Sequence, residues 1–283
     1  MASPMLRPLS PGEILDVSFS LFRSAFAPLI LIAVVTSGFG QIMGLYIEEL
    51  GGPLEYPIVW FSIMVASLIL GTIGVGATTF IISERYLGRS LPAGAAFGRA
   101  VPYFGRILVV SILAGLALMA GALLMLLPSG IILASGSLPA VPVMVVGSLL
   151  LVLLVVVLEL VIASGMLLAV PALVLEGLPN GTRALSRSWQ LTRGLRAKGL
   201  LTVSVALFLL IIPTLAAEFL VTMFGTGPRE QGDTPLALAA AAVVLSTIIS
   251  PYVYVVVTVL YYDARVRKEA FDLEMLAAEM QQD

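Results

Sequence analysis

The segment LPNGTRALSRSWQLTRGLRAKG, from Leu178 to Gly199, indicates how the rest of the chain is organised. It is polar, carries five cations and lies between two long apolar runs. Two earlier segments, starting at Leu9 and Leu91, share its opening pattern of Leu, then Ser or Pro, any residue and Gly. Ten residues after each glycine comes a bulky apolar residue, and an arginine follows within two more positions. We interpret the three segments as copies of one unit; chance similarity is the alternative, because these residue types are common.

The first copy has the features of a helix start. Ser10 and Glu13 fit a capping box, in which each side chain bonds the backbone N–H of the other residue, and Pro11 takes the first helical position. Apolar and polar residues then fall on different stripes of the helix. An amphipathic helix directly before an apolar run is typical of a helix that lies in the headgroup region of a membrane.

Composition restricts both the class and the chemistry of the protein. The chain is 59% hydrophobic and 11% charged, and its mean hydropathy is +1.08. A soluble domain could not bury so much apolar surface, so the sequence predicts an all-α, multi-pass membrane protein. Cysteine and histidine are both absent, which excludes disulfides, metal and haem sites built on these residues, and catalytic triads that use histidine. We therefore expect no metal and no cofactor.

Six apolar runs are long enough to cross a bilayer, which takes about 20 residues of helix. They cover residues 28–47, 57–83, 105–127, 141–175, 199–224 and 236–262. The fourth run exceeds one straight crossing, so it either tilts or projects beyond the bilayer. Pro213 and Pro251 lie inside the last two runs and predict kinks there.

The six runs pair into three units within one membrane domain, residues 1–283. Each unit is an interfacial amphipathic helix followed by a transmembrane hairpin. The units cover approximately residues 9–83, 91–175 and 178–262, and residues 263–283 form a tail that we expect to be helical. Small residues at four-residue spacing inside the runs predict close helix packing within the chain, with homo-oligomer formation as the alternative.

The distribution of positive charge predicts the orientation. Arg229 is the only one of the 15 lysines and arginines that does not fall on the side that holds both termini. Because cytoplasmic loops carry an excess of Lys and Arg, both termini are expected in the cytoplasm, and an even number of crossings agrees. We therefore expect a protein of the cytoplasmic (inner) membrane.

Three polar residues inside the apolar runs are candidates for a functional site: Glu159, Glu218 and Gln41. Glu159 is the sharpest of them, because it lies in the middle of the fourth run. A carboxyl group there is costly unless it is protonated, paired or facing water, and such groups often mark an ion or substrate path. The alternative is a structural role, in which a protonated Glu159 hydrogen-bonds a neighbouring helix. A transport role would require a polar cavity that reaches this residue.

Cations of the second and third units are candidates for contact with anionic headgroups or phosphate. They are Arg99, Arg106, Arg183, Arg187, Arg193, Arg196 and Lys198. Arg183 and Arg187 are four residues apart and should share a helix face. The alternative is that these cations only set topology. Trp189, Tyr261 and Tyr262 are expected to anchor the chain at headgroup level. Nucleic acid is not expected as a partner, because the chain has no soluble basic domain.

Three stretches resemble one family of bacterial polytopic proteins, the glycerophosphoryl diester phosphodiesterase membrane-domain family. They are RPLSPGEILDVSFSLFR (Arg7–Arg23), ALSRSWQLTRG (Ala184–Gly194) and YYDARVRKEAFDLE (Tyr261–Glu274), so the resemblance extends from end to end. It implies a six-helix inner-membrane protein. The family takes its name from fusions to a soluble catalytic barrel that relies on histidines. This chain has none, so the resemblance transfers no catalytic residues.

These observations favour a non-enzymatic integral membrane protein that acts in membrane transport or in handling lipids and their headgroups. The alternative is a structural or accessory subunit. In that case partner proteins, membrane proteins included, would dock on the basic cytoplasmic segments and on the C-terminal tail.

Overall fold

A computed structural model of the chain describes residues 7–135, 141–224 and 236–270. Within these ranges the chain is helical and contains no strand. Six segments are long and apolar enough to cross a membrane: Phe26–Ile47, Pro57–Tyr86, Ala93–Leu124, Leu149–Leu175, Arg196–Ala216 and Ala240–Glu269. The predicted class, an all-α multi-pass membrane protein, is confirmed. Arg229 and tail residues 271–283 lie outside the described residues.

The chain begins with a short helix and two long spans. They are α1 (Pro11–Ser24), α2 (Phe26–Ala33), a π-helical turn η1 (Val34–Gly38), α3 (Phe39–Glu49) and α4 (Pro57–Tyr86). The predicted capping box is present: the Ser10 hydroxyl accepts from the Glu13 N–H, and the Glu13 carboxylate accepts from the Ser10 N–H. That N–H, followed by the Arg7 guanidinium, lowers the pKa of Glu13 to about 2.

Two more short helices precede the other long spans. The second part of the chain forms α5 (Ala93–Ala100), a 3₁₀ turn η2 (Val101–Tyr103), α6 (Phe104–Ser135), α7 (Val141–Met166) and α8 (Ala169–Leu175). The third part forms α9 (Gly181–Thr192), α10 (Arg196–Phe224), α11 (Leu236–Ile249) and α12 (Pro251–Glu269). Helices α1, α5 and α9 therefore stand where the sequence predicts interfacial helices.

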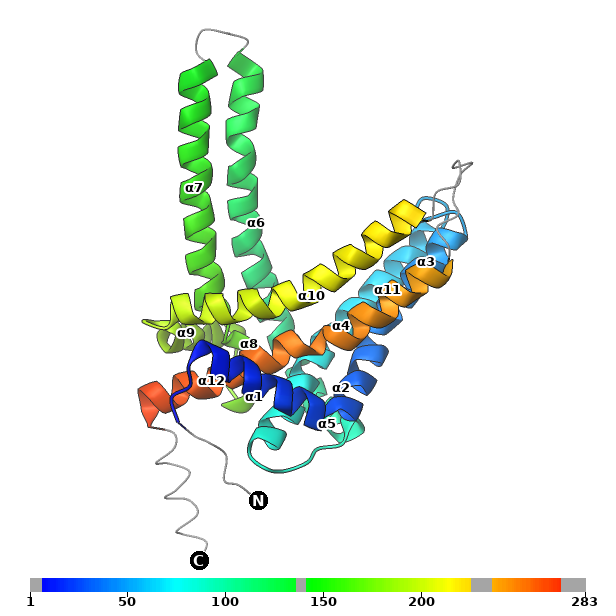
Figure 1. Cartoon of the computed structure of the whole chain (residues 1–283), viewed down its shortest axis with the longest axis vertical. Helices are drawn as coiled ribbons and strands as arrows, with labels where there is room; N and C mark the ends of the chain where they lie inside the picture. Colours follow the sequence, from blue (N-terminus) through cyan, green and yellow to red (C-terminus); the bar gives the residue numbers. More distant parts are fainter. Residues whose placement is uncertain (1–6, 136–140, 225–235, 271–283) are drawn as a thin grey trace, which may run out of the picture.

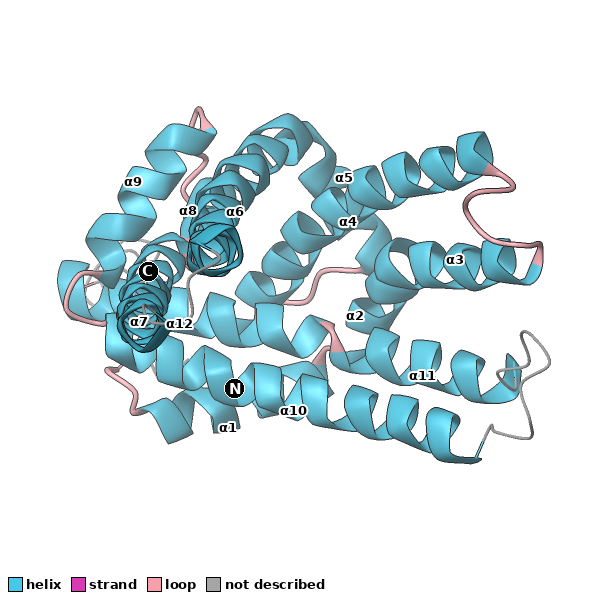
Figure 2. Cartoon of the chain, turned by 90° about the horizontal axis from the view of Figure 1, so that it is seen from above, coloured by secondary structure: helices cyan, strands magenta, loops and turns pink. Residues whose placement is uncertain are grey.

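The long helices form two diverging arms above a common base (Figure 1). Helices α6 and α7 project together as one arm, and α3, α4, α11 and the far half of α10 form the other. Seen from above, α1, α5, α8, α9 and α12 lie around and between the feet of these arms (Figure 2). Both arms present many exposed apolar side chains, which suits helices that face lipid.

Helix α12 is the centre of the base. Its residues are apolar around most of the circumference, and Val255, Val256, Val259 and Tyr261 have no exposed surface. A helix that is apolar on every side is stable only where other helices cover it. Helices α1, α4, α8, α9 and α10 all pack against it.

The fourth apolar run is divided into α7 and α8 rather than forming one long tilted helix. The Ser188 hydroxyl of α9 lies at the break, where it donates to the Gly165 carbonyl (2.7 Å) and accepts from the Leu168 N–H (3.0 Å). A side chain from another unit thus satisfies the backbone groups that the break exposes.

The two prolines act differently. Pro213 lies inside α10, which continues past it. Pro251 is the first residue of α12, after a break at Ser250. The sixth span therefore consists of two helices, because proline fits the first turn of a helix better than its interior.

Candidate functional site

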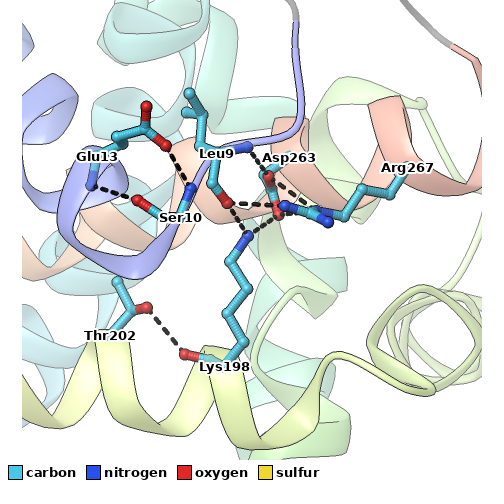
Figure 3. Close-up of polar contacts among 7 residues, drawn as sticks. All are labelled: Leu9, Ser10, Glu13, Lys198, Thr202, Asp263 and Arg267. Atoms are coloured by element: carbon cyan, nitrogen blue, oxygen red, sulfur yellow. Dashed lines mark hydrogen bonds and ion pairs between the residues drawn. The ribbon is translucent and has the colours of Figure 1, made fainter.

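One cluster of charges joins the N-terminal segment to α10 and α12 (Figure 3). Its centre is Asp263, which is 1% exposed. Asp263 accepts from the Leu9 N–H (2.7 Å), from Lys198 Nζ (2.5 Å) and from Arg267 Nε (3.1 Å). Lys198 and Arg267 both donate to the Leu9 carbonyl as well. Every charge in the cluster has a partner, so Lys198 is used inside the protein rather than offered to phosphate.

A second cluster is built around Arg187 of α9. Its guanidinium donates to Glu176 (2.8 Å) and pairs with Glu269 (2.5 Å), at the end of α12. Arg265 pairs with Glu269 at 3.0 Å, and the buried Tyr261 hydroxyl donates to Glu176 at 3.0 Å. The Glu269 hydrogen bond, followed by the Glu176 contacts, raises the pKa of Arg187 above its ordinary value despite partial burial. The guanidinium therefore stays charged and held between two carboxylates.

The two adjacent tyrosines lie inside the protein rather than at its surface. Tyr261 and Tyr262 are 0% and 4% exposed. Tyr262 hydrogen-bonds Ser83 (2.7 Å) and stacks on Tyr86 with ring centroids 4.8 Å apart. Two tyrosines at the end of an apolar run are typical of an interfacial belt, but here α4 and α8 cover them. An interfacial and a buried pair of tyrosines have the same sequence pattern, because only the packing of the surrounding helices distinguishes them.

The arginines of the second unit are also engaged within the chain. Arg99 pairs with Glu84 (3.0 Å), and its guanidinium lies 4.8 Å from the Phe80 ring centroid. Arg106 donates to the Leu178 carbonyl (2.9 Å) and lies over the Tyr103 ring at 4.5 Å. These contacts connect α5 and α6 to their neighbours.

Sequence reasoning missed the acidic partners of these cations. They are Glu84, Glu176, Asp263 and Glu269. Each lies in or beside the basic connections, which the positive-inside rule predicts to be cytoplasmic, and that rule gives acidic residues little weight. The sequence signal that could have revealed these partners is an acidic residue at the basic end of a span.

Helix α9 is different, because an exposed cation lies near each of its ends. Arg183 and Arg193 are exposed and make no ion pair in the described part of the chain. Trp189, 39% exposed, lies between them along the helix, and the Arg196 guanidinium stacks on its ring at 4.1 Å. The predicted pair Arg183 and Arg187 is therefore divided: Arg187 reaches inward to α12, and Arg183 remains at the surface.

The intramembrane candidates lie in two places. Glu159 is half-buried on α7 and lies against Gly121 of α6, where a Cβ atom would overlap its carboxyl group. Gln41 joins the first and sixth spans, because its amide oxygen accepts from the Ser246 hydroxyl (2.6 Å). The side chain of Glu218 lies outside what the structure describes. Among the described residues, no group of three or more acids is arranged to hold a metal ion.

Comparison with known proteins leaves the chain without a named relative. It matches no family model, no curated protein and no solved structure. The resemblance to the glycerophosphoryl diester phosphodiesterase membrane-domain family therefore stays a prediction drawn from three short motifs.

Proposed function

We propose that this chain is a non-enzymatic protein of the cytoplasmic membrane that handles lipids, with α9 contacting anionic headgroups at the cytoplasmic leaflet. One observation carries the proposal. Arg99, Arg106, Arg187 and Lys198 are engaged within the chain, whereas Arg183 of α9 and Arg193 directly after it are exposed and have no ion-pair partner among the described residues. A cation that only fastened helices together would have a partner inside the protein.

The composition of this region suits a bilayer surface. Arg183 lies in the first turn of α9 and Arg193 follows its last residue, so the two arginines lie near opposite ends of the helix. Trp189 between them is the residue type that favours the boundary between headgroups and hydrocarbon. Each basic residue close to an anionic surface contributes about 1 kcal/mol of attraction. Both arginines together would then favour anionic over zwitterionic lipid by about 30-fold.

Trp189 provides the measurement. The chain has only two tryptophans, so W60F leaves Trp189 as the sole indole. In nanodiscs, brominated phosphatidylglycerol is expected to quench its fluorescence more strongly than brominated phosphatidylcholine at equal mole fraction. Replacing Arg183 and Arg193 with Gln should lower the relative affinity for phosphatidylglycerol by at least about tenfold.

The matched control is R229Q in the same background, since Arg229 is expected on the opposite side of the membrane. It should leave the quenching unchanged. Equal quenching by the two lipids, or an unaltered preference in the double variant, would show that the exposed arginines only set topology. The thermal unfolding of each variant should match that of the parent, which excludes a folding defect as the cause of weaker quenching.

The proposed orientation has a direct test, because the chain contains no cysteine. A cysteine at position 231 should react with an impermeant maleimide added outside intact cells, and one at position 90 should react only after the cells are opened. In intact cells we expect near-complete labelling of the cysteine at position 231. The cysteine at position 90 should reach less than about a tenth of that level. The reverse pattern would place the basic side, and α9, outside the cell.

A further inference from the structure

A cavity of about 90 Å³ lies among the first, second and sixth spans, near the middle of the first and sixth. Its polar lining consists of five hydroxyl groups: Thr36, Ser37, Thr78, Ser250 and Tyr254. A cavity of this size has room for several water molecules. The lining contains no charged residue in the described part of the chain.

The backbone is irregular where two of these spans meet the cavity. The first span contains the π-helical turn Val34–Gly38, and the sixth is broken at Ser250. The second contributes Gly74, where a Cβ atom would come 2.7 Å from Thr36 Cγ2. Inside a membrane, irregular backbone is tolerated where protein buries it or where it lines a wet cavity. Single π turns and broken spans often lie at binding sites.

Hydrogen bonding gives this cavity both donors and acceptors. Thr36, Ser37 and Ser250 donate to backbone carbonyls of their own helices at 2.8, 2.9 and 3.3 Å. Their oxygen lone pairs therefore remain free to accept from a guest. Thr78 is 4% exposed, lines the cavity and makes no hydrogen bond within the described chain. Its Oγ1 is not among the fully buried atoms without a partner, so a guest in the cavity can reach this hydroxyl and accept a hydrogen bond from it.

Polar groups continue from the cavity along the first and sixth spans. The Gln41 amide donates to the carbonyl of Ser37 at 3.4 Å, and Ser246 donates to Gln41. Thr247, one residue further along α11, has a buried hydroxyl without a partner. This row leads away from the charged base, so the cavity is the inner end of a polar strip between two spans.

We propose that this cavity is a hydrated binding site for a small uncharged polyol, a function distinct from the lipid contact of α9. A polyol carries donors and acceptors close together, which matches the mixed set of hydroxyls. A charged guest would lack any compensating charge at this depth. An apolar guest would leave the Thr78 hydroxyl unpaired. The volume admits a molecule of only a few heavy atoms.

Cysteine reactivity tests for water in the cavity. T78C should react with methyl methanethiosulfonate about tenfold faster than T72C, because a thiol reacts as the thiolate, which forms only where water reaches it. Thr72 is the matched control: it lies on the same helix and is 7% exposed, and its hydroxyl bonds Leu68 rather than lining the cavity. S250C provides a second reporter from the sixth span, in case T78C does not fold.

Protection tests the guest. Glycerol and ethylene glycol should slow labelling of T78C and S250C by at least about threefold, and 1-propanol at equal concentration should not, because it offers a single hydroxyl. Equal reactivity of T78C and T72C would overturn the hydrated site. Fast labelling of T78C that no polyol slows would show that the cavity holds only water, and it would overturn the proposed binding site. Equal protection by 1-propanol would also overturn it, since the cavity would then bind any molecule of suitable size rather than a molecule with several hydroxyl groups.

Discussion

Asp263→Asn is expected to destabilise the protein by about 3–5 kcal/mol, the range found when one partner of a buried ion pair is removed. The carboxylate has no exposed surface, and it neutralises Lys198, whose side chain is 15% exposed. Asn can still accept from the Leu9 N–H, but the charges of Lys198 and Arg267 would remain uncompensated. The N-terminal segment would then separate from α12, because Leu9 is held by the same cluster.

Unfolding by sodium dodecyl sulfate in mixed micelles measures this loss. D16N is the control: Asp16 is exposed on α1, and its replacement should change stability by less than about 0.5 kcal/mol. Replacing Asp263, Lys198 and Arg267 together with Leu, Met and Met should recover much of the loss, because well-packed apolar residues can replace a buried ion triad. A D263N protein as stable as the parent would show that the cluster does not hold the base together.

Gly165→Ala is the second change with a large expected effect, about 3 kcal/mol of destabilisation, at the upper end for overpacking. A Cβ atom at this position would lie 2.1 Å from Trp189 Cε3 and 2.2 Å from Cζ3. An indole ring cannot yield as the end of a flexible chain would. The ring should be displaced, and with it the Arg196 guanidinium that stacks on it.

Thermal unfolding and the emission maximum of Trp189 in the W60F background report both consequences. Gly115→Ala on α6 is the matched control, because nothing lies within 4 Å of its Cβ position. This replacement should leave the free energy of unfolding unchanged or raise it by at most about 1 kcal/mol, since alanine has a higher helix propensity than glycine. Restoring space with Trp189→Leu in the G165A protein should recover part of the stability. Emission and stability equal to those of the parent would refute the proposed packing of Trp189 on Gly165.

Predictions that depend on local patterns came close to the structure. The capping box of Ser10 and Glu13 involves residues three apart, so a short motif suffices to specify it. The starts of the six spans were placed to within a few residues, except where Ala93–Tyr103 continues into the third span and where the fourth run divides. That division depends on Ser188, which lies more than 20 residues beyond Gly165. Inside the run, Pro171 in the first turn of α8 is the local signal, because proline disrupts a helix interior.

The candidate site was less accessible to prediction. The sequence singled out the basic residues as a group but did not distinguish those that are paired from those that are exposed. Arg183 and Arg187 are the same residue type, four positions apart. Within the described residues only Arg187 of the two forms ion pairs, because the packing of α8 and α12 places Glu176 and Glu269 beside it. Gln41 was identified as polar and intramembrane, but its partner Ser246 is 205 residues away.

By itself the sequence determined the class of this protein and the approximate positions of its spans. Both follow from sums along the chain, because hydropathy over about 20 residues decides a crossing. Only the tertiary structure decided which charges pair and which hydroxyls surround a cavity. Leu9 and Asp263 are 254 residues apart. Contacts at that separation depend on helix packing, in which the same residue type becomes a buried partner or an exposed group according to its neighbours.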